Sequence, residues 1–132
     1  MSLFTKCILK DKEEIDGVRI SVMSRHTLND GVTPDTRITS SSFDKHLPEL
    51  APSPKLIGDY YKRGLLWGEF EFRFREQIKG ASTQIILTEI ATMSLSENVT
   101  LLCIEDEPHF CHRWLLGEEC RRLVPEITVE YR

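Results

Sequence analysis

The stretch that most limits the fold of this chain is VTLLCI, residues 99–104, which is almost entirely apolar. A short run of this kind is typical of a strand that is buried on both faces. Residues 108–123 then have the pattern of a helix that Pro125 stops, and ITVEY, residues 127–131, has the pattern of a further strand. A buried strand, a helix and a second strand in this order indicate a parallel pair within an α/β domain.

The rest of the chain supplies the other elements of such a domain. Strands are predicted over residues 3–8 and 18–24, and residues 25–42 form a long polar loop. Helices are predicted over 54–64, 66–79 and 82–94; the phenylalanines of the second alternate as in a strand, but its length favours a helix.

Caps and burial follow from the same patterns. Ser53, followed by Pro54, is the predicted cap of the first of these helices, and Ser82 is the predicted cap of the third. The third helix is expected to turn four apolar side chains inward: Ile85, Ile86, Ile90 and Met93. We therefore predict one α/β domain over residues 1–132, with three layers in which a small, largely parallel sheet is flanked by helices.

Composition narrows the classes of function and the expected location. The net charge of −4 argues against a nucleic-acid partner, because such domains usually carry a clear basic excess. No apolar run reaches the roughly 20 residues that a membrane span needs, and the first residues lack the apolar core of a secretory signal. The four cysteines include no C-x-x-C pair, so we expect free thiols in a reducing cytoplasm.

Chemically active side chains cluster around the end of the 99–104 strand. Cys103 and Glu105 stand at its carboxyl end, where ligands of parallel sheets bind, and Cys111, His112 and Arg113 follow at the start of the next helix. The helix start carries about half a positive charge, which favours a bound anion and lowers the pKa of a thiol such as that of Cys111. A packing role for Cys103 is the competing interpretation.

A second segment is expected to reach the same rim. The strand over residues 18–24 ends in Ser24 and is followed by Arg25 and His26. If the two strands are parallel, these side chains converge with Arg113 on one anion. The favoured hypothesis is an enzyme or ligand-binding domain for a small anionic molecule such as a nucleotide or phosphorylated metabolite. His112 would be its acid or base, and Cys111 or Cys103 its nucleophile.

Two other functions remain open from the residues alone. One is a metal site built from Cys103, Cys111 and His112 or His26, with Glu105 as a further ligand, although the spacing matches no usual structural zinc motif. The other is a non-catalytic interaction domain. Neither a C-x5-R phosphatase loop nor a G-x-x-x-x-G-K phosphate loop is present. No particular cofactor is indicated.

These residues resemble the uncharacterised family called domain of unknown function 488. In that family an apolar strand is followed by Cys, a small residue and Glu, then a short acidic loop ending in Pro, and then Cys-His-Arg; this chain has LLCIEDEPHFCHR. The resemblance implies an α/β fold without an established activity. It carries over six positions: Arg25, Cys103, Glu105, Cys111, His112 and Arg113. The chain departs from the family pattern at Ser24, Ile104 and Trp114.

Overall fold

The computed structural model describes all residues from 1 to 132 and consists of one sheet with four α-helices. The strands are β1 (Leu3–Cys7), β2 (Val18–Ser21), β3 (Lys45–His46), β4 (Val99–Cys103) and β5 (Val129–Tyr131). The helices are α1 (Pro54–Tyr61), α2 (Trp67–Gln77), α3 (Ala81–Met93) and α4 (His112–Leu123), with short 3-10 turns η1 (Glu14–Asp16) and η2 (Pro48–Leu50).

All five strands are parallel and lie in the order β3-β2-β4-β1-β5. This confirms the predicted α/β class and the parallel sheet. The apolar strand β4 is at the centre and is buried along its whole length. The carboxyl ends of β2 and β4 therefore lie side by side at one edge of the sheet, as the sequence predicts.

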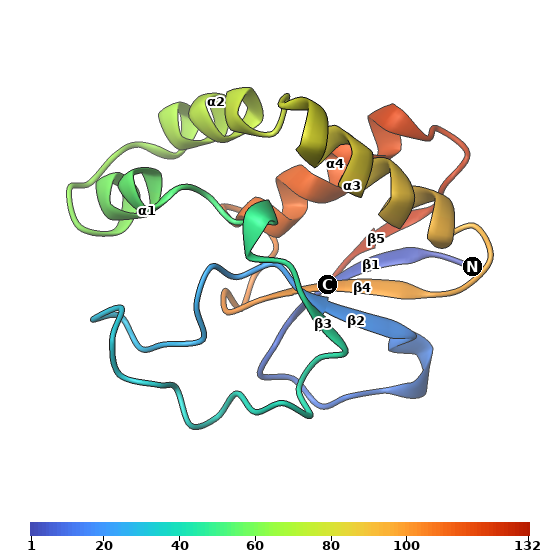
Figure 1. Cartoon of the computed structure of the whole chain (residues 1–132), viewed down its shortest axis with the longest axis horizontal. Coiled ribbons are helices and arrows are strands. Elements are labelled where there is room, and N and C mark those ends of the chain that lie inside the picture. Colours follow the sequence, from blue (N-terminus) through green and yellow to red (C-terminus); the bar gives the residue numbers. More distant parts are fainter.

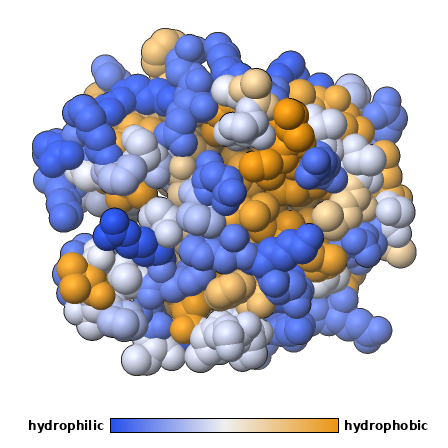
Figure 2. All heavy atoms as spheres, in the orientation of Figure 1, coloured by the Kyte–Doolittle hydropathy of each residue, from blue (hydrophilic) through white to orange (hydrophobic).

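The two faces of the sheet are covered differently. The four α-helices lie above the sheet in Figure 1, with α4 against β1, β4 and β5 and α3 packed on α4. The connection from β2 to β3 lies below the sheet as an extended loop (Figure 1), so the third layer consists of loops. Figure 2 shows apolar side chains gathered right of centre, where the helical layer meets the sheet in Figure 1. No helix has both the length and the apolar character that a membrane span requires.

Several local expectations are confirmed. Ser53 caps α1 by accepting a hydrogen bond from the amide of Leu56, with Pro54 at the first helical position. Residues Trp67–Gln77 form a helix, and Phe70 and Phe74 are buried on its inner face. A helix is favoured there because the apolar spacing of four places these two rings on one side.

Other expectations require correction. The cap of α3 is Gly80, without a side-chain hydrogen bond, and not Ser82. Its buried side is formed by Leu87, Ile90 and Ala91, whereas Ile85 is 60% exposed, because the phase of the helix turns it outward. The helix α4 begins at His112 and not at Pro108, since residues 104–110 form an irregular loop in which Phe110 has a positive φ of 61°.

Candidate functional site

The site is built from the end of β4 and the start of α4. Cys103 is the last residue of β4, and Cys111 is the residue that precedes the first turn of α4, with extended backbone angles φ −128° and ψ 141°. Cys111 therefore lies at the end of the loop that returns from the sheet to the helix. Cys103 Sγ, Cys111 Sγ and one ring nitrogen of His112 all lie within 4.8 Å of one another, and the three residues are buried.

The imidazole of His112 has a defined orientation between β2 and β4. Its Nε2 lies 2.8 Å from the carbonyl oxygen of Val22, and its Nδ1 lies 3.8 Å from Cys103 Sγ. A carbonyl only accepts hydrogen bonds, so in the neutral ring Nε2 carries the hydrogen and Nδ1 presents its lone pair to the sulfur. The Phe74 ring and the imidazole pack edge to face, with centroids 5.6 Å apart. The ring can thus accept a proton or a metal ion on the side of the cysteines.

The two thiols have opposite shifts in pKa. A hydrogen bond from the Cys111 thiol lowers the pKa of Cys103, and this effect, together with the Glu105 amide and the charge of Arg113, exceeds the rise due to burial. Burial and the neighbouring Cys103 raise the pKa of Cys111 well above its ordinary value. This corrects the expectation that the helix start makes Cys111 the more acidic thiol, because the side chain is buried and the second sulfur is adjacent.

Arg113 has no exposed surface, and its guanidinium binds the loop that precedes α4. It donates to the carbonyl oxygens of Glu105 (2.7 Å), Asp106 (3.3 Å) and Arg132 (3.2 Å), and to Cys111 Sγ (3.4 Å). Arg113 Nε is buried without a partner. The side chain therefore holds the end of β5 and the 104–110 loop together and contributes positive charge beside the sulfurs.

Arg25 is exposed and donates to the carbonyl of Gly31 at 3.2 Å, within the connection that follows β2. The hydrogen bonds of Arg113 go instead to the 104–110 loop and to the end of β5. Anion binding by these two arginines stays a prediction.

The remaining predicted residues lie in two places. Glu105 lies beside Cys103, Cys111 and His112, which we call the Cys-His cluster, and His26 lies beside Ser21. Glu105 accepts a hydrogen bond from the hydroxyl of Tyr61 at the end of α1. His26 Nε2 lies 2.7 Å from the Ser21 hydroxyl, and burial, with the nearby His46, lowers the pKa of His26. Ser24 is half-buried.

Sequence reasoning missed three partners of the site. They are Tyr61, the Val22 carbonyl and the Phe74 ring, which come from α1, the end of β2 and α2. A contact made by a main-chain carbonyl cannot be inferred from the sequence, because every residue has one. The Tyr60-Tyr61 pair at the end of a helix is visible there, but nothing in the sequence places that helix next to Glu105.

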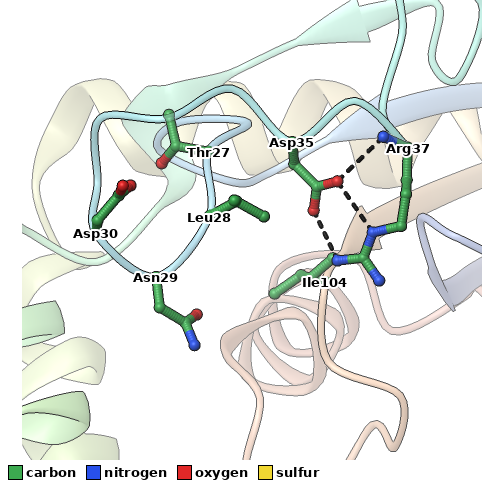
Figure 3. A pocket seen from close by; sticks show the side chains of 7 residues that line it. All are labelled: Thr27, Leu28, Asn29, Asp30, Asp35, Arg37 and Ile104. Atoms are coloured by element: carbon green, nitrogen blue, oxygen red, sulfur yellow. Dashed lines mark hydrogen bonds and ion pairs between the residues drawn. The ribbon is translucent and has the colours of Figure 1, made fainter.

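A cavity of about 390 Å³ lies beside the same edge of the sheet, on the side of the β2–β3 connection. In Figure 3, Asp35 and Arg37 form a two-bond ion pair at its margin, with contacts of 2.7 and 3.0 Å, and Ile104 is a further lining residue. Ile104 directly follows Cys103, so the cavity adjoins the strand that carries the thiol. Its lining comprises Thr27, Leu28, Asn29, Asp30, Asp35, Arg37 and Ile104.

Comparison with known proteins identifies the family. Residues 3–122 match the family DUF488-N3a, which is described as the active DUF488-N3 subclade. No curated protein and no solved structure matches the chain significantly. The matched region begins at β1 and ends within α4, so it contains both halves of the Cys-His cluster. Because the match covers most of the chain, this protein belongs to the DUF488-N3a family.

Proposed function

We propose that this protein is a cytoplasmic, cysteine-dependent enzyme for a small anionic molecule, with the thiolate of Cys103 as nucleophile. The observation that carries the proposal is the orientation of His112, whose Nδ1 faces Cys103 Sγ while Nε2 is anchored on the Val22 carbonyl. A thiol with an oriented imidazole at its side is the arrangement that activates cysteine nucleophiles. The description of the subclade as active agrees with an enzymatic role.

The proposed chemistry follows from the groups that surround His112 Nδ1 and Cys103 Sγ. Nδ1 of His112 takes the proton of the Cys103 thiol, and the Cys111 thiol and the Glu105 amide stabilise the resulting thiolate. The thiolate attacks an electrophilic carbon or phosphorus atom of the substrate, and one new bond to sulfur forms as the bond to the leaving group breaks. The imidazolium of His112 returns its proton to that leaving group.

The substrate class rests on positive charge near the sulfur. The guanidinium of Arg113 lies beside Cys111 Sγ, and Arg25 is exposed in the neighbouring connection. A nucleotide or a phosphorylated metabolite is the class that such groups favour. Cys103 is only 4% exposed, so substrate reaches it when the irregular 104–110 loop moves away from α1.

The test is a titration of thiolate by its ultraviolet absorbance, which needs no reagent to enter the site. We expect one thiolate to form below the ordinary thiol pKa in the wild-type protein and to disappear in Cys103→Ser. Cys120→Ser is the matched control, because Cys120 is equally buried and burial raises its pKa to about 12. Loss of the early step in Cys111→Ser and not in Cys103→Ser would overturn the assignment of the nucleophile.

The anionic substrate is tested separately. Inorganic phosphate or a nucleoside phosphate should slow alkylation of Cys103 in the wild type, and the protection should weaken in Arg25→Ala. Equal protection in Arg25→Ala and the wild type would remove Arg25 from the site. No protection by either anion in the wild type would remove the anionic substrate class while leaving the thiolate in place.

A second candidate function is a metal centre at the same three residues. Their ligand atoms are grouped within 4.8 Å, and the Nε2 contact with Val22 is the kind of outer hydrogen bond that orients metal-bound histidines. Two thiolates and an imidazole suit zinc, with the fourth position free for water. Elemental analysis of untagged protein decides between the candidates: stoichiometric zinc favours the metal centre, and metal-free protein whose melting temperature is unchanged by zinc excludes it.

A further inference from the structure

The four cysteines differ in what their sulfur atoms face. The Cys7 thiol is directed to the carbonyl of Ile104 at 3.4 Å, and that of Cys120 to the carbonyl of Leu87 at 3.6 Å. Cys103 and Cys111 instead have their sulfurs within 4.8 Å of each other. All four residues are buried and free. The thiols of Cys103 and Cys111 thus lie close together in the interior of the protein.

The backbone around this pair allows the sulfurs to approach further. A disulfide needs a sulfur separation of about 2 Å, so the atoms must close by a further distance of up to about 3 Å. Cys103 ends a strand, whereas Cys111 precedes α4 with extended backbone angles and is joined to Cys103 by the irregular 104–110 loop. That loop has no helical or strand hydrogen bonds of its own and is held by the side chain of Arg113. Closure of the pair therefore needs a local shift of the loop and of the Cys111 side chain, while the Cys111 carbonyl keeps its bond to the amide of Trp114 in α4.

We propose that Cys103 and Cys111 are a reversible oxidation site in which a hydroperoxide oxidises the Cys103 thiolate to a sulfenic acid and Cys111 resolves it into a disulfide. This inference rests on the proposed thiolate of Cys103, and it assigns Cys111 a role that the nucleophilic mechanism does not give it. The disulfide removes the nucleophile, so the modification switches the site off until a dithiol reduces it.

The two steps balance as follows. The Cys103 thiolate attacks the distal oxygen of the hydroperoxide and forms an S–O bond, while the O–O bond breaks and the alkoxide, or hydroxide, takes a proton from solvent or His112. The Cys111 thiol then attacks the sulfenic sulfur, an S–S bond forms, and the S–O bond breaks to release water with the Cys111 proton. The two thiols lose two electrons in total, and the hydroperoxide gains them.

Neighbouring groups favour Cys103 as the first sulfur and Cys111 as the second. Arg113 Nη1 lies 3.4 Å from Cys111 Sγ and stabilises the negative charge that develops there as its proton leaves. Cys7 is the alternative resolving thiol, because it stands opposite Cys103 in the register of β1 and β4. Its thiol points to a carbonyl oxygen, however, and it lies within a regular strand.

The experiment treats the reduced full-length chain with hydrogen peroxide in the presence of a chelator and maps the products by mass spectrometry. We expect a Cys103–Cys111 disulfide in the wild type, in Cys7→Ser and in the control Cys120→Ser, and its reversal by dithiothreitol. In Cys111→Ser we expect sulfenic acid to persist at Cys103, where dimedone traps it in several-fold greater yield than in the wild type.

Every other outcome contradicts the proposal and shows which part of it is wrong. A Cys7–Cys103 disulfide in the wild type would show that Cys7 is the resolving thiol. Sulfinic acid at Cys103 with Cys111 still reduced would show that Cys111 does not resolve it. If neither product forms although the titration shows the Cys103 thiolate, the oxidation site is wrong and the proposed nucleophile survives. If the titration also lacks the thiolate, both fail together.

Discussion

At the scale of single residues, the environment of a charge decides what that charge can do. Arg113 and Arg25 are both guanidinium groups near the carboxyl edge of the sheet, yet only Arg113 is fully buried. Its donors bind three main-chain carbonyls from two separate segments, the 104–110 loop and the end of β5. A buried carbonyl that loses its donor costs about 1–3 kcal/mol, whereas an exposed one binds water instead.

The substitution Arg113→Met should therefore destabilise the protein by roughly 3 kcal/mol, since several carbonyls lose a charged donor together. Arg25→Met is the matched control, and its effect should stay within about 0.5 kcal/mol, because this side chain is exposed and has one hydrogen bond. Urea denaturation of both variants measures the difference. Equal stabilities would mean that Arg113 does not hold the 104–110 loop.

The residues of the Cys-His cluster could be predicted because they share one strand-to-helix connection. Cys103 and Cys111 flank a short loop, so their proximity follows from local chain geometry once β4 and α4 are recognised. The relative acidity of the two thiols could not be predicted, since the pKa of each depends on how deeply its sulfur is buried and on the interaction with the neighbouring thiol. The position of Arg25 could not be predicted either, because a long irregular connection follows β2.

At the scale of elements, the link from β1 to β2 depends on one close contact. Gly17 stands between η1 and β2 with φ 62° and ψ −133°, a region almost restricted to glycine. A Cβ atom there would lie 2.0 Å from the carbonyl oxygen of Asn98, directly before β4. The glycine thus lets the start of β2 lie against the start of β4.

Gly17→Ala should lower the free energy of unfolding by at least about 3 kcal/mol, because strain in φ and a backbone clash add together. Gly31→Ala is the control within the same chain. Gly31 also has a positive φ, 73°, but a Cβ there meets nothing within 4 Å, so the cost should be only about 1 kcal/mol. Thermal denaturation of both variants compares the effect of backbone strain alone, at Gly31, with that of strain and a steric clash together, at Gly17. Similar melting temperatures would contradict the close contact.

The elements themselves were predictable where packing and periodicity agree. The strand β4 and the helix α2 follow from a continuous apolar run and from an apolar spacing of four. The strand β3 was not predicted, because Lys45–His46 is only two residues long. The start of α4 was misplaced because a proline that favours a first helical turn is here part of the loop.

At the scale of the whole molecule, a buried charged group joins the segments on the loop side of the sheet. Asp16 is fully buried and accepts hydrogen bonds from Lys6 of β1 and Arg19 of β2. The guanidinium of Arg132, at the end of the chain, lies 3.8 Å from the same carboxylate. Asp16 therefore faces cations from three separate parts of the sequence, two of which, Lys6 and Arg132, also lie near Glu13.

The protein should consequently become less stable in acid, as the carboxylate of Asp16 is protonated. Burial alone raises the pKa of this carboxyl, but the hydrogen bonds from Glu13, Lys6 and Arg19 outweigh it and hold the pKa below its ordinary value of 3.8. A lowered pKa in the folded state means that the contribution is complete at neutral pH and disappears as the pH falls below about 4, through the folded pKa.

Asp16→Asn removes this dependence and leaves Arg19 buried without its counter-charge, whereas Lys6 keeps Glu13 as a partner at 2.7 Å. Removing one partner of a buried ion pair typically costs about 3 kcal/mol or more. We expect the variant to be less stable than the wild type at pH 7 and the difference to shrink as the pH approaches about 3. Glu130→Gln is the control, because Glu130 pairs with Arg132 on the exposed surface. Urea midpoints of the three proteins across this range measure the effect, and a constant difference between Asp16→Asn and the wild type would show that Asp16 does not link the fold to pH.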